Sequence, residues 1–560
     1  MARPSLGFHL QIDTVKGNQY GRLVHSQRID GKPRRVTLVQ LGRLTPAQIA
    51  NIRAWLARSP LLPPDVQTAF HDLKDVRKRR TWLYGRVALG HFLWRKLGMH
   101  RIVLEALGRV PGKLQAAQAV EIMVLNRLAD PTSKYGLLEW LPKSAAPLLV
   151  GFRPTSVHEN LFYRGMDRLW QARDTVDRLV YERVVRPTTH APRVLLHDLT
   201  SSYFEGAGGE LGRFGYSRDH RGDRPQVAWG MVVTPEGLPI THQVYPGNTN
   251  DKSTVQGMLE RVQRLCGLSS GLYVGDRGMK SEEIQRELHA RGFHYILAEV
   301  NRNVEEVLRA AQNLPPVGHH QRNEVREIID RDGQRFIVLL NAQRRQEELD
   351  VLEQRLAQGR AILDELRRRW AKRPRHHHIL LRQAHAALAA KGLSDLFEMD
   401  WDENTLQGLT ARLKEGAVRH RRDAGWWVLA TDTDLPALEV ARLYMGLTVI
   451  EQGWRELKSV LEVRPIRHRL ERRVEAHLAL CVLAYLLEKY LELKVRDRGL
   501  TGEAALEQFD TVTLDELELD RSGLTRMAVT DLNEVQKQVL EAAGFSADSF
   551  EAGWRTLDGV

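Results

Sequence analysis

The sequence reads R-V-L-L-H-D-L-T-S-S-Y-F-E-G over residues 193–206, and it places one carboxylate, Asp198, directly after an apolar run. The apolar residues 194–196 predict a short strand buried on both faces. An ionised carboxylate beside such a core is costly unless a partner neutralises it, and a metal ion is one such partner. Taken alone, Asp198 is more often explained as a turn cap or an arginine partner. Whether Asp198 is a metal ligand therefore depends on whether the sequence places other carboxylates near it.

A second stretch supplies such a carboxylate. Residues 272–279 read L-Y-V-G-D-R-G-M, which predicts another apolar strand that ends at Asp276. The Arg277-Gly278 step that follows suits a turn out of the strand. Two predicted strands therefore end in the same type of side chain.

The third carboxylate, Glu451, falls within a helix predicted over residues 436–463. Tyr444, Glu451 and Lys458 are seven residues apart, so each step drifts only about 20° round the helix axis and the three share one stripe. Arg455 and Glu462 fall on the same stripe. The predicted opposite face is apolar: Leu443, Leu447, Ile450, Trp454, Leu457 and Leu461. A charged stripe of this kind is usually a solvated face with pairs at helical spacing.

Several motifs follow one another in order along the chain. They are H-D-L-T-S-S-Y-F, G-Y-S-R-D-H-R-G-D-R-P-Q-V, P-G-N-T-N-D-K-S-T, V-G-D-R-G-M and a late Tyr-x6-Glu-x6-Lys helix. Together they resemble the DDE transposases of bacterial insertion sequences, and within them the insertion sequence four superfamily and its sixteen-thirty-four-like subgroup. The resemblance covers residues from about 20 to 493 and implies that Asp198, Asp276 and Glu451 are the catalytic, metal-binding residues.

The resemblance also implies further roles. Implied DNA contacts are Tyr444, Lys458, Arg455 and Arg277, and implied supporting residues near the sheet edge are Asp219, His220, Asn248 and Asp251. One position departs from the family signature, because Leu447 stands where the family has Arg. Arg455 or Arg442 is the alternative phosphate contact.

Composition agrees with a polyanionic partner. Lys and Arg total 82 against 70 Asp and Glu, which gives a net charge of +12. The two cysteines, Cys266 and Cys481, provide neither a disulfide framework nor a thiolate zinc site. We find no signal segment, and the apolar run at 478–487 is too short to span a bilayer. The expectation is a soluble protein of the bacterial cytoplasm, without membrane contact and nucleoid-associated when bound to DNA.

The predicted fold class is α/β. From residue 192 the pattern predicts three strands, a helix, a strand, a helix and a strand, the order of an RNase H-like mixed sheet. In that fold, the resemblance implies, the first and fourth strands lie side by side and bring Asp198 close to Asp276. The stretch between Asp276 and Glu451 is far longer than a connection requires, so a large α+β insertion is expected.

The predicted parts are listed in chain order. Residues 1–85 form a β-hairpin that turns at Asp30-Gly31, plus a basic helical segment in which Lys78, Arg79 and Arg80 are candidate DNA contacts. Residues 86–190 form a helical domain, and residues 191–300 the first part of the core. Residues 301–424 form the insertion, with a hairpin and a coiled-coil-like helix that serves as an arm or a dimer contact. Residues 425–495 complete the core, and residues 496–560 form a C-terminal helical module.

Three carboxylates held together would repel one another unless cations neutralise them. Oxygen ligands without thiols favour Mg²⁺, with Mn²⁺ as a substitute. The resemblance therefore implies a transposase that binds the terminal inverted repeats of an element, cleaves double-stranded DNA there and joins the 3′-hydroxyl ends to target DNA, acting as a homodimer. The alternatives are a catalytically silent DNA-binding relative and an RNase H-like structure-specific nuclease.

Overall fold

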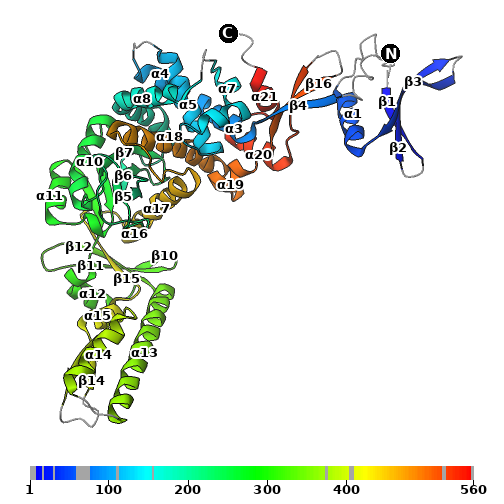
Figure 1. Cartoon of the computed structure of the whole chain (residues 1–560). Coiled ribbons are helices and arrows are strands. Elements are labelled where there is room, and N and C mark those ends of the chain that lie inside the picture. The colour runs from blue at the N-terminus through cyan, green and yellow to red at the C-terminus, as the bar shows by residue number, and fades with distance from the viewer. Residues whose placement is uncertain are drawn as a thin grey trace. The chain divides into compact units, whose positions relative to one another are not determined.

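The computed structural model describes residues 8–15, 18–29, 32–58, 76–108, 112–153, 157–372, 376–402, 409–519 and 525–555 (Figure 1). Contacts divide the chain into two compact units. The larger unit comprises Leu97–Ala117 and Tyr163–Tyr490, and the smaller comprises Met1–Lys96, Gln118–Phe162 and Leu491–Val560. The finer division into six parts stays a prediction.

A nine-stranded mixed sheet lies at the centre of the larger unit, in the order β10-β11-β12-β15-β9-β8-β5-β6-β7. β5 pairs in parallel with β8, and β8 with β9, whereas the other neighbours are antiparallel. The strands are β5 (Val194–Tyr203), β6 (Gln226–Val233), β7 (Pro239–Pro246), β8 (Gly271–Gly275), β9 (Phe293–Ala298), β10 (Gly318–His320), β11 (Asn323–Ile329), β12 (Arg335–Asn341) and β15 (Trp426–Thr431).

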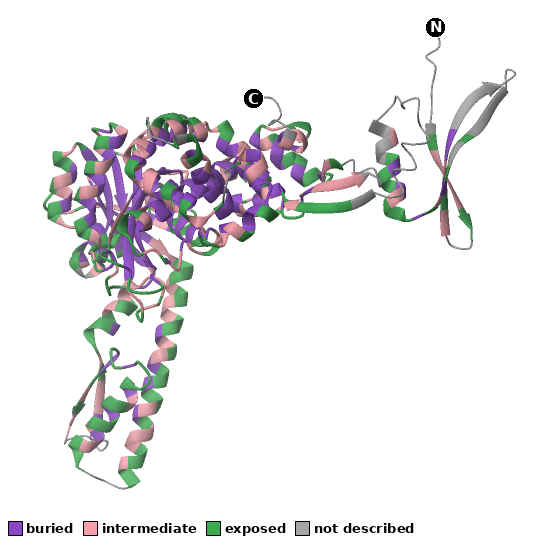
Figure 2. Ribbon diagram, turned by 45° about the horizontal axis from the view of Figure 1, so that its top comes forward, coloured by how far each residue is buried: buried purple, intermediate pink, exposed green. Residues whose placement is uncertain are grey.

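The predicted order of elements in the first part of the core is confirmed. Helix α10 (Asp251–Cys266) connects β7 to β8, and α11 (Glu282–Ala290) connects β8 to β9. Asn250 caps α10 by accepting the Lys252 N–H, and Gly267 ends it with φ 65°. Because every residue of β6 is buried, the sheet forms the core of this unit (Figure 2). The mixed sheet agrees with the predicted RNase H-like class.

The helix predicted over residues 436–463 is divided into three consecutive pieces. They are α16 (Ala437–Met445), α17 (Leu447–Arg455) and the π-helical turn η5 (Glu456–Val460), with Gly446 between the first two. The predicted apolar face is buried throughout. A π-helical turn holds more residues than an α-helical one, so it rotates the side chains that follow away from the stripe expected for a regular helix.

The insertion differs from the prediction in one respect. Its hairpin, β11 and β12 turning at Asp332-Gly333, is not separate from the core, because β12 pairs with β15 and so extends the main sheet. Beyond it lie α13 (Ala342–Lys372), α14 (His377–Ala389), β13 (Phe397–Trp401), β14 (Leu409–Leu413) and α15 (Glu415–Asp423). The predicted leucine seam of α13 packs on α14 and β13 in a core of their own. A short helix, α12 (Glu305–Gln312), lies between β9 and β10.

The smaller unit contains two short sheets. The predicted hairpin is confirmed as β2 (Asn18–Ile29) and β3 (Lys32–Leu44), with β1 (Phe8–Val15) beside β2 and α1 (Pro46–Arg58) following. The Asp30-Gly31 turn lies outside the described residues. The predicted basic helical segment is wrong where it is described, because Lys78, Arg79 and Arg80 lie on strand β4 (Val76–Leu83). β4 pairs with β16 (Thr513–Leu519), which pairs with β17 (Thr525–Val529).

The prediction that the C-terminal region is purely helical is therefore wrong, because β16 and β17 are strands. Acidic side chains of β16 pair with basic side chains of β4. A strand of this kind forms because a distant segment pairs with it, so local helix preference does not predict it. The helices of this region are α19 (Gly502–Glu507), α20 (Glu534–Ala543) and α21 (Ala547–Ala552).

The described part of residues 86–190 is helical, as predicted. It contains α3 (Gly85–Lys96), α4 (Met99–Ala106), α5 (Lys113–Ala129), α6 (Leu137–Trp140), α7 (Ala146–Val150), α8 (Glu159–Val180) and α9 (Arg186–Thr188). A long buried helix, α18 (Glu471–Val495), follows the π-helical turn. Within the described ranges, no helix is both long enough and apolar enough to cross a bilayer.

Candidate active site

Asp198 and Asp276 lie at the same edge of the sheet because of the register between β5 and β8. His197 pairs with Gly275 in this parallel ladder, so the next residue on each strand is an aspartate. Asp198 is partly buried, and Asp276 is exposed. The sequence prediction that these two carboxylates lie on neighbouring strands is confirmed.

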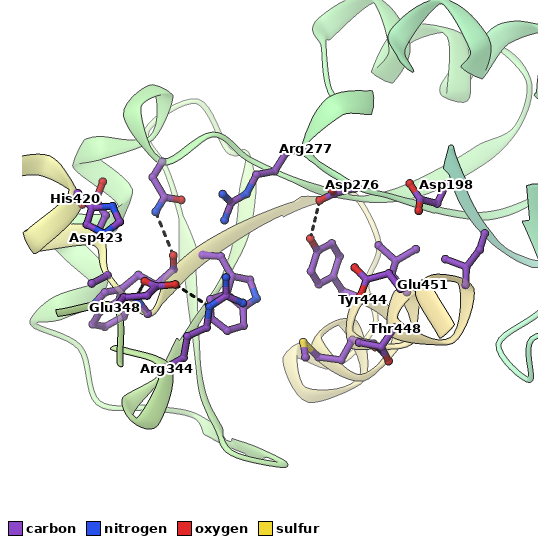
Figure 3. Close-up of a pocket in the computed structure, with 18 residues that line it drawn as sticks. Asp198, Asp276, Arg277, Arg344, Glu348, His420, Asp423, Tyr444, Thr448 and Glu451 are labelled. Carbon is purple, nitrogen blue, oxygen red and sulfur yellow. Dashed lines mark hydrogen bonds and ion pairs between the residues drawn. The ribbon is translucent and has the colours of Figure 1, made fainter. Parts of the chain in front are cut away.

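Side chains of α17 and α16 each donate a hydrogen bond to one of these carboxylates. The indole Nε1 of Trp454 donates to Asp198 Oδ2 at 2.8 Å. The Tyr444 hydroxyl donates to Asp276 Oδ1 at 3.2 Å (Figure 3). Each bond occupies one carboxylate oxygen. Because a carboxylate oxygen can accept more than one contact, both aspartates can still bind a further ligand.

Burial raises the pKa of Asp198 to about 7. Hydrogen bonds from Trp454 and from the backbone N–H of Leu199 lower this pKa, the negative charge of Asp276 raises it further, and the positive charge of Arg218 lowers it. A carboxylate that is costly to ionise next to a second carboxylate is stabilised by a cation.

Glu451 faces the same space from α17. Asp198, Asp276 and Glu451 all line one cavity of about 460 Å³, and the Glu451 side chain is exposed (Figure 3). A sheet edge and a helix that are far apart in the sequence thus bring three carboxylates to one pocket.

The opposite wall of this pocket comes from the insertion and from β15. It includes Arg344 and Glu348 of α13, His420 and Asp423 of α15, and Trp427 of β15. Arg344 donates to Glu348 at 2.8 Å, and its guanidinium also lies 5.3 Å from the Trp427 ring centroid. The pocket therefore has a carboxylate wall and a wall that combines basic, acidic and aromatic groups.

The three carboxylates fit a divalent cation by donor chemistry. The side chains of Asp198, Asp276 and Glu451 provide hard oxygen ligands, which suit Mg²⁺ or Mn²⁺. Among the described residues, no three such groups are already close enough to hold one ion.

Tyr444 and Arg277 also line the pocket. Burial raises the pKa of Tyr444, and the negative charge of Asp276 raises it further, so the hydroxyl stays protonated as a donor. Arg277 follows Asp276 directly and is exposed.

Leu447, at the position of the family Arg, is buried and lines the pocket, and Arg442 pairs with Glu439. Arg455 is exposed.

Lys458 does not line the pocket, although the regular helical stripe placed it beside Glu451. It lies in η5, and its ammonium group forms an ion pair with Asp219 at 2.8 Å. The Asp219 side chain is 1% exposed and also pairs with Arg464. Burial lowers the pKa of Lys458, and Asp219 partly offsets this effect. A role of Lys458 in DNA contact stays a prediction.

The supporting residues lie around this ion pair. Arg218 donates to both Asp251 oxygens at 2.9 Å, so Asp251 fixes the arginine next to Asp219. His220 is exposed and has a left-handed backbone with φ 56°. Asn248 is exposed too. The motif that contains Asp219 is therefore tied by an ion pair to the segment that follows Glu451.

The basic residues of β4 belong to the smaller unit. Lys78 pairs with Asp515 at 2.8 Å, Arg79 pairs with Glu518 at 2.8 Å, and Arg80 lies 5.4 Å from the Trp82 ring centroid. Two of the three candidate DNA contacts thus have carboxylate partners on β16. Their contact with DNA stays a prediction.

Sequence reasoning missed the hydrogen-bonding role of Trp454. It was assigned only to the apolar face of the helix, and it is indeed buried, but its indole N–H needs an acceptor when buried. The position of this tryptophan, three residues after Glu451 on the same helix, could have indicated that its N–H lies near the site. Arg344 and Trp427 carried no comparable signal, because only the folded insertion brings them to the pocket.

Comparison with known proteins gives the following results. Curated protein sequences gave no match. Among solved structures, the chain is similar to a cryo-EM structure of the piggyBac transposase synaptic complex with hairpin DNA, at 8% identity and a TM-score of 0.38, over 76% of this chain and 79% of that one.

The family model described as "Transposase DDE domain" matches residues 189–487. This range contains the whole main sheet, the insertion and the helix of Glu451. The match spans more than half of the 560 residues, and the chain therefore belongs to the transposase DDE domain family.

Proposed function

We propose that this protein is a metal-dependent DDE transposase that binds the terminal inverted repeats of an insertion sequence, cleaves DNA there and joins the 3′-hydroxyl ends to target DNA. One observation carries the proposal: Asp198, Asp276 and Glu451 line one pocket in a chain of the transposase DDE domain family. The assignment to the insertion sequence four superfamily and its sixteen-thirty-four-like subgroup is part of this proposal.

Asp198, Asp276 and Glu451 would hold Mg²⁺, or Mn²⁺ in its place. When bound, such ions supply activation of a water or a 3′-hydroxyl and stabilisation of the leaving oxygen. Trp454 and Tyr444 orient the two aspartates through the hydrogen bonds described above. Arg277, exposed at the pocket wall, provides a positive charge for a phosphate of the bound strand.

The protein is further proposed to act as a homodimer on two DNA ends in the bacterial cytoplasm. The net charge of +12 supports a DNA partner, because lysine and arginine neutralise backbone phosphates.

The test incubates the purified full-length protein with labelled DNA that carries both ends flanking the gene, with a target plasmid and with Mg²⁺ or EDTA. We expect metal-dependent nicking and joining. Asp198→Asn, Asp276→Asn and Glu451→Gln each lower both reactions at least about 100-fold, because each removes a charged oxygen ligand.

Glu348→Gln is the matched control, since Glu348 is a carboxylate of the same pocket outside the proposed ligand set. It retains cleavage. Binding to the ends without any metal-dependent product from the unaltered protein would instead favour a silent DNA-binding relative. Cleavage of branched DNA regardless of sequence, without joining, would favour a structure-specific nuclease.

A further inference from the structure

The loop between β5 and β6 presents two aromatic side chains to solvent. Phe214 is 68% exposed and Tyr216 is 78% exposed. Large aromatic side chains gain stability from burial, so two of them on one short loop require an explanation. We call residues 213–220 the aromatic loop.

The backbone of the aromatic loop is anchored on both sides of these residues. Arg213 and Gln226 exchange backbone hydrogen bonds of 3.1 and 2.8 Å, and the Arg218 N–H donates to Ser201 Oγ at 2.9 Å. Gly215 packs so closely on the neighbouring chain that a Cβ there would lie 2.2 Å from the Gly247 carbonyl oxygen. The two aromatic side chains are therefore held outward by an ordered scaffold.

Tyr216 also has a fixed cationic support. The Arg218 guanidinium lies 5.7 Å from its ring centroid, and Asp251 holds that guanidinium through two hydrogen bonds. A supported ring loses little conformational entropy when a partner stacks on it.

Exposed arginines come from a second segment, which runs beside the residues that lead into this loop. Phe204 and Ile466 form a β-bridge, and Gly209 packs on the backbone of Arg469. Arg467 and Arg469 are both exposed, and within the described part of the chain neither forms an ion pair. Exposed aromatic rings beside exposed arginines match a nucleic acid, which offers base faces and phosphates together.

The aromatic loop is also continuous with the proposed active site. The positive charge of Arg218 acts on the Asp198 carboxylate, and Asp219 binds Lys458 in the segment that follows Glu451. The loop therefore contains residues that act directly on Asp198 and on the segment after Glu451.

We propose that Phe214 and Tyr216 stack on bases of the DNA end next to the cleavage position, while Arg467 and Arg469 contact its phosphates. This inference rests on the proposed function and deepens it, because it assigns residues that bind the DNA end. Aromatic stacking tolerates any base, and it stabilises bases that have left the duplex stack.

The experiment measures binding of full-length protein to fluorescent end DNA by anisotropy, in EDTA and over a series of salt concentrations. Phe214→Ala and Tyr216→Ala each weaken binding by about 5- to 100-fold with an unchanged salt slope, because stacking carries no charge. Tyr216→Phe retains the ring and most of the affinity. Arg467→Gln and Arg469→Gln each reduce the salt slope by about one.

Tyr135→Ala is the matched control, because Tyr135 is 66% exposed in the smaller unit. It binds as the unaltered protein does. Thermal melting checks that every variant is folded. Alanine variants that melt normally and bind end DNA as tightly as the unaltered protein overturn the inference alone, whereas failure of the unaltered protein to bind the ends overturns the proposed function as well.

Discussion

At the scale of single residues, the indole of Trp454 is the contact that most directly controls Asp198. Its hydrogen bond favours the ionised carboxylate, against the burial that raises the pKa to about 7. The ring also packs edge-on to Trp229, with centroids 4.7 Å apart, so its position is fixed. Trp454 is thus a positioning residue for the proposed metal ligand.

Trp454→Phe removes this donor while it keeps an aromatic ring in the core. The pKa of Asp198 then rises further, and we expect the acid limb of the pH profile of DNA cleavage to move upward by about one pH unit. Trp229→Phe is the control, since the Trp229 indole donates to Ser202 instead. An equal shift in both variants would contradict the assignment.

The raised pKa of Asp198 also makes the stability of the metal-free protein depend on pH. The folded state keeps a proton that the unfolded state releases at a lower pH, so this contribution is complete below about pH 4 and is lost as the pH rises through about 7. In EDTA, the free energy of unfolding of the unaltered protein therefore falls between pH 5 and 8 relative to Asp198→Asn.

Added Mg²⁺ reverses this trend, because it binds the ionised form. Chemical denaturation at pH 5, 6.5 and 8, with and without Mg²⁺, measures the effect. Identical pH profiles for the unaltered protein and Asp198→Asn would show that this carboxyl group titrates normally.

At the scale of elements, the division of the Glu451 helix determines which side chains reach the pocket. The seven-residue spacing correctly predicted that Tyr444 and Glu451 share a face, and both line the cavity. It could not predict the π-helical turn η5, because hydrogen-bond shifts of that kind depend on packing. Lys458 consequently reaches Asp219, and a residue that periodicity assigned to the surface stabilises the core.

Asp219→Asn leaves Lys458 and Arg464 without their shared counter-charge. Their side chains are only 10% and 31% exposed, so we expect a loss of about 3 kcal/mol in the free energy of unfolding. Denaturation with urea measures it. The double variant Asp219→Asn with Lys458→Met recovers part of the loss, and no loss in the single variant would mean that water replaces the carboxylate.

At the scale of the whole molecule, the resemblance to DDE transposases predicted that the first and fourth core strands lie side by side and bring Asp198 close to Asp276, and the β5–β8 pair agrees with this. The sequence did not predict that β10, β11 and β12 extend the main sheet, since strand pairing across a long insertion leaves no local pattern. The pairing of β4 with β16 was missed for the same reason: their residues lie at opposite ends of the chain.

The leucine seam of the insertion is covered by its own chain, so it is not available as a dimer contact. Leu356 is fully buried in the insertion core, and Leu356→Ala lowers the stability of the insertion by about 2–5 kcal/mol. Limited proteolysis detects faster cleavage there, while mass photometry finds the same number of chains per DNA complex. Val351→Ala, at a position that is 57% exposed on the same helix, changes neither result.

The order of the three carboxylates along the chain has a consequence for synthesis. A ribosome that has translated Asp198 and Asp276 still has to produce the whole insertion before Glu451 emerges. Until then, the two aspartates at the sheet edge have no helix facing them, and Trp454 and Tyr444 are absent from their hydrogen bonds. Under the proposed function, a nascent or truncated chain that lacks Glu451 therefore cannot cut DNA, and the protein becomes able to cut the genome that encodes it only after the insertion has been synthesised.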